Sequence, residues 1–123
     1  LQLLFPRILE RAGYKAIVAQ NGQEALELFK KLRSEGVDLG VVVSDARMPF
    51  MNGPELATQI YEIDPRVRVV AVTSEMGELR EAFQRQTAQN VHCILPKPLP
   101  HSNELVAAVN DAYIDYDRRS TTP

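Results

Sequence analysis

Three polar side chains close mostly apolar runs in this chain of 123 residues. They are Asp45 after the run 39–44, Thr73 after the run 67–72 and Lys97 shortly after the run 91–95. Ligands of a parallel α/β sheet bind outside the carboxyl ends of its strands, so we expect the three side chains to lie close together. A carboxylate, a hydroxyl and an ammonium in one place are suited to binding an anion or to phosphoryl transfer.

The spacing of apolar residues predicts alternating helices and strands. Predicted strands are Lys15–Val18, 39–44, 67–72 and 91–95, and predicted helices include Leu1–Ala12, Asn21–Leu32, Pro54–Ile63, Met76–Gln86 and Leu105–Tyr113. We expect Asn21 to cap its helix, Pro54 to lie in a first turn, and the polar tail 117–123 to fray. Alternation of this kind indicates right-handed crossovers and a parallel sheet with helices on both faces.

Composition narrows the function. The 14 basic and 16 acidic residues give a net charge of −2, which offers no argument for a nucleic acid or an anionic membrane as the partner. The single cysteine, Cys93, lies in an apolar run and is interpreted as an inert buried thiol. No apolar run has the length of a membrane span and no signal peptide is visible, so the cytoplasm is the expected compartment.

Several short motifs occur together in one order. They are Asn21-Gly22-Gln23-Glu24-Ala25-Leu26, Ser44-Asp45, Met48-Pro49, Asn52-Gly53, Thr73-Ser74 and Lys97-Pro98. In this order and spacing the chain resembles the response-regulator receiver domain of two-component signalling. The resemblance runs from Leu1 to about Tyr116 and makes 1–116 a receiver domain followed by the polar tail 117–123.

The resemblance implies a flavodoxin-like, doubly wound α/β fold with a parallel five-stranded sheet in the order 2-1-3-4-5. The family's first strand and the acidic pair at its end are missing from the sequence, which begins inside what should be the first helix. Loss of a central strand would leave buried backbone groups unpaired. We therefore expect an incomplete N-terminus, with the acidic pair before Leu1. A strand swapped in from another chain is the minor alternative.

The resemblance also implies roles for single residues. Asp45 would be the phosphoacceptor, and Lys97 and Thr73 would bind the phosphoryl oxygens. Asp45, the backbone carbonyl of Arg47 and the missing acidic pair would hold Mg²⁺. Thr73 would act as a switch residue together with Ile94, which stands where the family usually has an aromatic residue. The Lys97-Pro98 peptide would be cis.

The implied function is a phosphorylation switch and not a classical enzyme. A histidine kinase, a phosphotransfer protein or a small phosphodonor would phosphorylate Asp45, and the surface from Met76 through Tyr113 would change. That surface is the expected partner or homodimer face, and nucleic acid would be reached only through an effector domain outside this chain.

Two other readings stay open. A phosphorylation-independent pseudo-receiver that only binds a protein is favoured by the absent acidic pair and by Ile94. A haloacid dehalogenase-type enzyme also uses a strand-end aspartate, but it needs a second Asp where this chain has Arg47.

Overall fold

The computed structural model describes residues 2–8, 13–14, 17–47, 50–74, 77–86, 89–97 and 102–121. The strands are β1 (Gln2–Ile8), β2 (Gly13–Tyr14), β3 (Ile17–Ala19), β4 (Leu39–Asp45), β5 (Arg68–Thr73) and β6 (Val91–Pro96). The helices are α1 (Gly22–Ser34), α2 (Gly53–Ile63), α3 (Glu78–Gln86) and α4 (Ser102–Thr121). Every segment predicted from residue 17 onward has its counterpart here, within a few residues.

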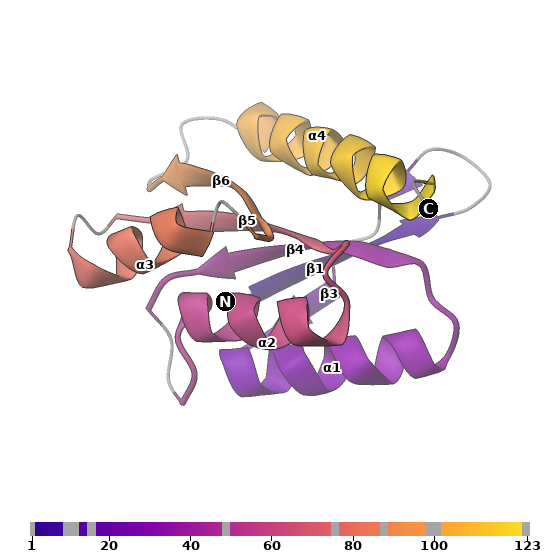
Figure 1. Cartoon of the computed structure of the whole chain (residues 1–123), viewed down its shortest axis with the longest axis horizontal. Coiled ribbons are helices and arrows are strands. Elements are labelled where there is room, and N and C mark those ends of the chain that lie inside the picture. Colours follow the sequence, from indigo (N-terminus) through magenta and orange to yellow (C-terminus); the bar gives the residue numbers. More distant parts are fainter. Residues whose placement is uncertain are drawn as a thin grey trace.

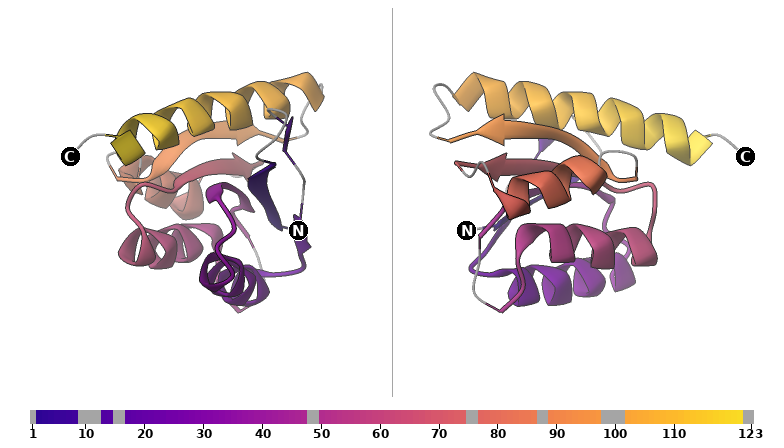
Figure 2. Two further views of the ribbon diagram at one scale, coloured as in Figure 1. Left: turned by 90° about the vertical axis from the view of Figure 1, so that its right-hand side faces the viewer. Right: turned by 60° about the vertical axis from the view of Figure 1, so that its left-hand side comes forward.

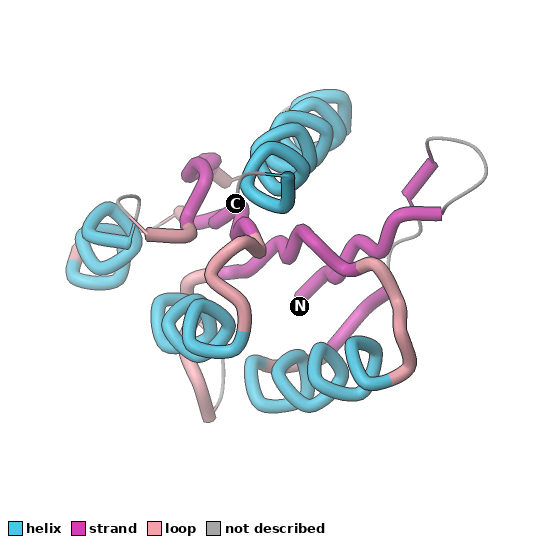
Figure 3. Tube along the Cα trace, turned by 45° about the vertical axis from the view of Figure 1, so that its right-hand side comes forward, coloured by secondary structure: helices cyan, strands magenta, loops and turns pink. Residues whose placement is uncertain are grey.

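The sheet lies between two helical layers. The strand β3 pairs with β1, and the order continues through β4, β5 and β6, while the short β2 pairs with the other end of β1. The pairs β4–β5 and β5–β6 are parallel. Helices α1, α2 and α3 lie on one side of the sheet and α4 on the other (Figures 1 and 3). The sandwich explains why the six residues that open β4 are all buried, as expected for a strand covered on both faces.

The prediction of a helix over Leu1–Ala12 is wrong for the residues that the structure describes. Gln2–Ile8 form β1, which runs antiparallel between β3 and β4. Apolar residues at helical spacing favour a helix locally. Between β3 and β4, however, the segment finds backbone hydrogen-bond partners on both sides. Pairing there satisfies backbone N–H and C=O groups that would otherwise be buried without a partner. Pro6 lies at a register shift of the β1–β4 pairing, where a residue without an N–H is tolerated.

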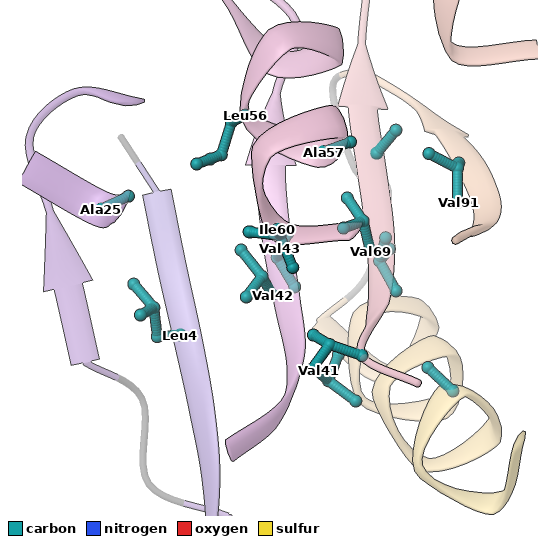
Figure 4. Packing of buried hydrophobic residues seen from close by; sticks show 14 of the residues in the cluster. Leu4, Ala25, Val41, Val42, Val43, Leu56, Ala57, Ile60, Val69 and Val91 are labelled. Atoms are coloured by element: carbon teal, nitrogen blue, oxygen red, sulfur yellow. The ribbon is translucent and has the colours of Figure 1, made fainter. Parts of the chain in front are cut away.

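The strand β1 therefore fills, from within the same chain, the central place that the expected strand order left empty. The expected order with a gap is corrected accordingly: the gap is closed, but by a strand of reversed direction. Leu4 of β1 is fully buried and pairs with Val42 of β4. Figure 4 shows Leu4 on the side of Ala25 from α1, Val42 beside Ile60 of α2, and Val41 turned to the other side of the sheet, toward α4.

Helix α4 continues through Thr121, so residues 117–121 of the tail are helical and not frayed. Its buried face contacts β4 and β5 through Val109, Ala112, Tyr113 and Tyr116. The two views of Figure 2 show α4 lying across the face of the sheet opposite to α1, α2 and α3. Gly40 permits this approach, because a Cβ there would lie 2.6–2.8 Å from ring atoms of Tyr116.

Tyr113→Phe tests how α4 is held. The Tyr113 hydroxyl accepts a hydrogen bond of 3.1 Å from the Gly40 backbone N–H, and both residues are buried. Removing the oxygen leaves that N–H without this acceptor, so we expect the free energy of unfolding to fall by about 1–2 kcal/mol. Urea denaturation of both proteins measures it. An unchanged midpoint would show that the N–H finds another acceptor.

Asp64 connects α1 and α2 by hydrogen bonds at the edge of the sheet opposite to Asp45. It ends α2 as the C-cap, and its carboxylate accepts hydrogen bonds from Arg33 of α1 at 2.7 Å and from Arg66 at 2.8 and 2.9 Å. Burial raises the pKa of Asp64, but hydrogen bonds from the Arg66 side chain and backbone and the charges of Arg66 and Arg33 outweigh it and lower the pKa to about 2. The buried carboxylate is therefore ionised and fully hydrogen-bonded in the folded protein.

This arrangement predicts a pH dependence of stability. Since the folded pKa lies below the ordinary 3.8, the ionised carboxylate stabilises the fold above about pH 4, and that contribution disappears as the pH falls toward 2. A shift of nearly two units corresponds to about 2 kcal/mol. Urea denaturation at a series of pH values should show this loss in the wild type. Asp64→Asn should lack that part of the slope; equal slopes would refute the assignment.

Candidate functional site

The carboxyl ends of β4, β5 and β6 meet at one edge of the sheet, as the sequence predicted. Asp45 of β4 pairs with Val72 of β5, and Thr73 of β5 pairs with Pro96 of β6. Lys97 follows directly, and its backbone N–H donates a 3.2 Å hydrogen bond to the Thr73 carbonyl oxygen. The parallel register alone thus brings residues 45, 73 and 97 to the same edge.

Asp45 and Lys97 form an ion pair at this edge. The Lys97 ammonium donates a hydrogen bond to Oδ2 of Asp45. The Asp45 side chain is 22% exposed and the Lys97 side chain 40%, so both groups are accessible to a solute. Thr73, between them in the strand order, is almost fully buried. A partly exposed carboxylate beside an ammonium is a nucleophile with a cation in place for an incoming phosphate.

Backbone hydrogen bonds hold the loop that follows Asp45. Ala46 donates to the Val72 carbonyl at 3.3 Å, and the Gly53 N–H donates to the Ala46 carbonyl at 2.8 Å. Asn52 and Glu55 then form a capping box that starts α2, with Pro54 in the first turn as predicted. Hydrogen bonds therefore hold both ends of the loop, and they fix the backbone next to Asp45, the candidate phosphoacceptor.

Gly53 is a site residue whose role the motif did not explain. A Cβ at this position would overlap the carbonyl oxygen of Asp45 and the ring of Phe83 from α3. The first turn of α2 therefore lies directly against the Asp45 backbone, and Phe83 closes the contact from the other side. The dipeptide Asn52-Gly53 was noticeable in the sequence, but nothing in it indicated that Phe83 would be the neighbour.

Other predicted site residues are placed in part. Arg47 is exposed two residues after Asp45, and Ile94 lies in β6 opposite Ala71, half-buried against the core. The metal role of the Arg47 backbone carbonyl and the switch role of Ile94 stay predictions. Met48-Pro49, Met76 and Pro98, and with Pro98 the cis peptide, lie outside the described residues.

The described residues do not fit a complete magnesium site. Mg²⁺ requires a near-octahedral set of oxygen ligands, often with more than one carboxylate. Within the described ranges, no three His, Cys, Asp or Glu side chains are arranged to hold a metal ion. The start of β1 lies at this edge, because β1 is antiparallel to β4, and Gln2–Ile8 contains no acid. Asp45 is thus the one predicted metal carboxylate within the described residues.

Among the described residues, no helix is both long enough and apolar enough to span a bilayer.

Comparisons with known proteins agree on one family. The family described as response regulator receiver domain matches residues 1–110. A response regulator receiver protein of Anaeromyxobacter is 33% identical over 92 residues, which cover 75% of this chain and 36% of the relative. The sensor kinase CckA of Brucella abortus is 34% identical over 93 residues, covering 75% of this chain and 9% of the kinase. The chain therefore spans a small part of these relatives.

The fold has solved counterparts. A response regulator receiver domain protein from Clostridium thermocellum superposes with a TM-score of 0.68 at 25% identity, covering 85% of this chain and 75% of that one. The matched family, the flavodoxin-like arrangement and the strand-end residues lead to the same conclusion: the chain belongs to the response-regulator receiver domains of two-component signalling.

Proposed function

We propose that this chain is a phosphoacceptor whose Asp45 carboxylate takes a phosphoryl group from a histidine kinase, a phosphotransfer protein or a small phosphodonor. A carboxylate oxygen of Asp45 attacks the phosphorus. The bond to the donor nitrogen or oxygen breaks, and its electron pair stays with the donor. The observation that carries this proposal is the accessible Asp45–Lys97 pair at the carboxyl edge of the sheet.

Lys97 and Thr73 are proposed to bind the product. In the resting structure Lys97 neutralises the Asp45 carboxylate. When Asp45 is phosphorylated, the same ammonium pairs with phosphoryl oxygens as a point charge. Thr73 ends β5, the strand between β4 and β6, and its hydroxyl would donate a hydrogen bond to a phosphoryl oxygen. Positioning and charge neutralisation of this kind are what phosphoryl transfer requires.

The proposed output is a change of the surface formed by α3, β6 and α4. The Thr73 carbonyl bonds the Lys97 N–H, which connects the end of β5 directly to the end of β6. A movement of either residue toward a phosphoryl group therefore acts on the two segments that lead into α3 and α4. This surface is proposed as the partner or homodimer face of a cytoplasmic switch, and nucleic acid would be bound only by an effector domain.

We propose Mg²⁺ as the cofactor of the transfer, although the described residues supply only part of its ligands. Receiver domains use Mg²⁺ at an acidic pocket, to which Asp45 and the backbone carbonyl of Arg47 would contribute here. Asp45 is the one carboxylate that the described residues bring to this pocket, and water molecules would occupy the other positions of the ion.

The second candidate is a phosphorylation-independent protein-binding module. It is favoured by the reversed β1, which brings no carboxylate to the site edge. The accessible pair of Asp45 and Lys97 opposes it.

Intact-mass measurement after incubation with acetyl phosphate and Mg²⁺ separates the two candidates. We expect one phosphoryl adduct that is lost at alkaline pH, as an acyl phosphate is, and that maps to the peptide with Asp45. An adduct stable at alkaline pH, or on another peptide, would contradict the phosphoacceptor. Absence of any adduct from acetyl phosphate and from autophosphorylated kinases alike would favour the binding module.

A further inference from the structure

Phe50 is the most exposed of the large apolar side chains that the structure describes. It is 88% exposed, whereas Phe29 and Phe83 are fully buried. Ile63, Val106 and Ile114, the other exposed large apolar residues of the described ranges, are 36–56% exposed. An isolated surface leucine or valine needs no explanation, but a whole phenyl ring in water is a far larger apolar surface.

The backbone at Phe50 is also unusual. Its φ is +69°, in the left-handed region that bulky residues rarely adopt. The other described residue with a positive φ is Gly36, which carries no such penalty. Met51, the next residue, packs against the core. The backbone at Phe50 thus adopts a disfavoured conformation in which Met51 packs against the core while the Phe50 ring lies in solvent.

The position of Phe50 connects it with Asp45. It lies five residues after Asp45, in the loop that the hydrogen bond from Gly53 to Ala46 closes. Figure 1 shows this loop between β4 and α2 projecting beside the ends of α1 and α2 at the site edge. The capping box of Asn52 and Glu55 fixes the end of the loop. An apolar ring held on a loop with fixed ends contributes binding energy at little entropic cost.

We propose that Phe50 is a docking residue for the protein that donates the phosphoryl group to Asp45, where it meets an apolar patch beside the donor's phosphohistidine. This inference rests on the proposed function. Because the donor histidine must reach the Asp45 carboxylate from the open edge, the surface around that histidine covers the adjoining loop. A small phosphodonor reaches the same carboxylate without touching the loop. Aromatic side chains that become fully desolvated are typical anchors of protein interfaces.

Two donors test this inference. The sensor kinases of the genome that encodes this chain are purified and autophosphorylated, and the kinase that labels the wild type fastest is kept as the protein donor. Acetyl phosphate is the small donor. Phe50→Ala should lower kcat/KM for the kinase about tenfold or more, while the acetyl phosphate rate changes less than about twofold. Phe50→Leu, which keeps an apolar side chain, should retain part of the kinase rate.

Two controls separate contact from conformation. Phe50→Asn removes the ring but tolerates a positive φ, so it should lose kinase transfer as much as the alanine variant. Ile63→Ala removes a 36%-exposed apolar side chain from the last turn of α2, at the end away from the Asp45 loop, and should leave both rates unchanged.

The remaining outcomes overturn the inference. Equal rates of the wild type and Phe50→Ala with the kinase would show that the ring makes no contact. An equal loss with both donors would place Phe50 in the phosphoacceptor site itself. If acetyl phosphate labels Asp45 but no kinase does, there is no protein donor for Phe50 to contact. Failure of the proposed function looks different, because the wild type would then accept nothing from either donor.

Discussion

Asp45→Asn is expected to abolish the phosphoryl adduct completely. The amide has nearly the shape of the carboxylate but is a much weaker nucleophile, and no other carboxylate of the described residues is seen to pair with Lys97. The folded structure should survive, because the ion pair is partly exposed on both sides and such pairs contribute at most about 1 kcal/mol. Intact mass after incubation with acetyl phosphate, together with urea denaturation, measures both effects.

Asp38→Asn is the matched control for this experiment. Asp38 precedes the opposite end of β4 and accepts a hydrogen bond from the Tyr116 hydroxyl at 3.3 Å. It carries the same substitution far along the strand from Lys97, so we expect wild-type labelling. An adduct that persists at full occupancy in Asp45→Asn would refute the phosphoacceptor assignment. A loss in both variants would point to a general effect of charge or stability.

Gly53→Ala is expected to have the largest effect on stability, about 3 kcal/mol or more. The new methyl group would overlap the Asp45 carbonyl oxygen and the Phe83 ring, so α2 or the end of β4 must move. The ring contact can be relieved by a smaller side chain, but the backbone contact cannot. We therefore expect Phe83→Leu to restore only part of the stability of Gly53→Ala, and labelling of Asp45 to stay impaired in the double variant.

Gly77→Ala is the control for the glycine substitution. No heavy atom lies within 4 Å of a Cβ built at Gly77, and its φ is not positive. Its free energy of unfolding should change by less than about 1 kcal/mol. Urea denaturation of the wild type, Gly53→Ala, the double variant with Phe83→Leu, and Gly77→Ala measures these changes in the free energy of unfolding. If Gly53→Ala were as stable as Gly77→Ala, the close packing of α2 against the Asp45 backbone would be disproved.

The strand ends of the site could be predicted from sequence because each signal is local. A continuous apolar run marks a strand covered on both faces, and the polar residue that ends it marks the edge. Parallel pairing then brought together Asp45, Thr73 and Lys97 without further information. The helix start at Asn21 could be predicted in the same way, because a cap depends on a side chain and a backbone N–H three residues apart, and Pro54 indicated the first turn of α2.

The N-terminal segment shows where local signals fail. Helical spacing over Leu1–Ala12 predicted a helix, yet Gln2–Ile8 pair as a strand between β3 and β4. Residues 117–121 were expected to fray because they are polar, yet they extend α4. In both segments the outcome depends on partners that lie far away in sequence, the open backbone groups of two strands in the first and the docked face of α4 in the second.

The sequence by itself determined the family, the parallel order of β4, β5 and β6 and the candidate phosphoacceptor, since these depend on residue types at fixed short spacing. Only the tertiary structure decided that β1 is reversed, that Gly53 touches the Asp45 backbone and Phe83, and that Phe50 stands in solvent. Such features depend on which backbones approach one another across the core. Close packing sets those approaches through distant residues, which no local pattern records.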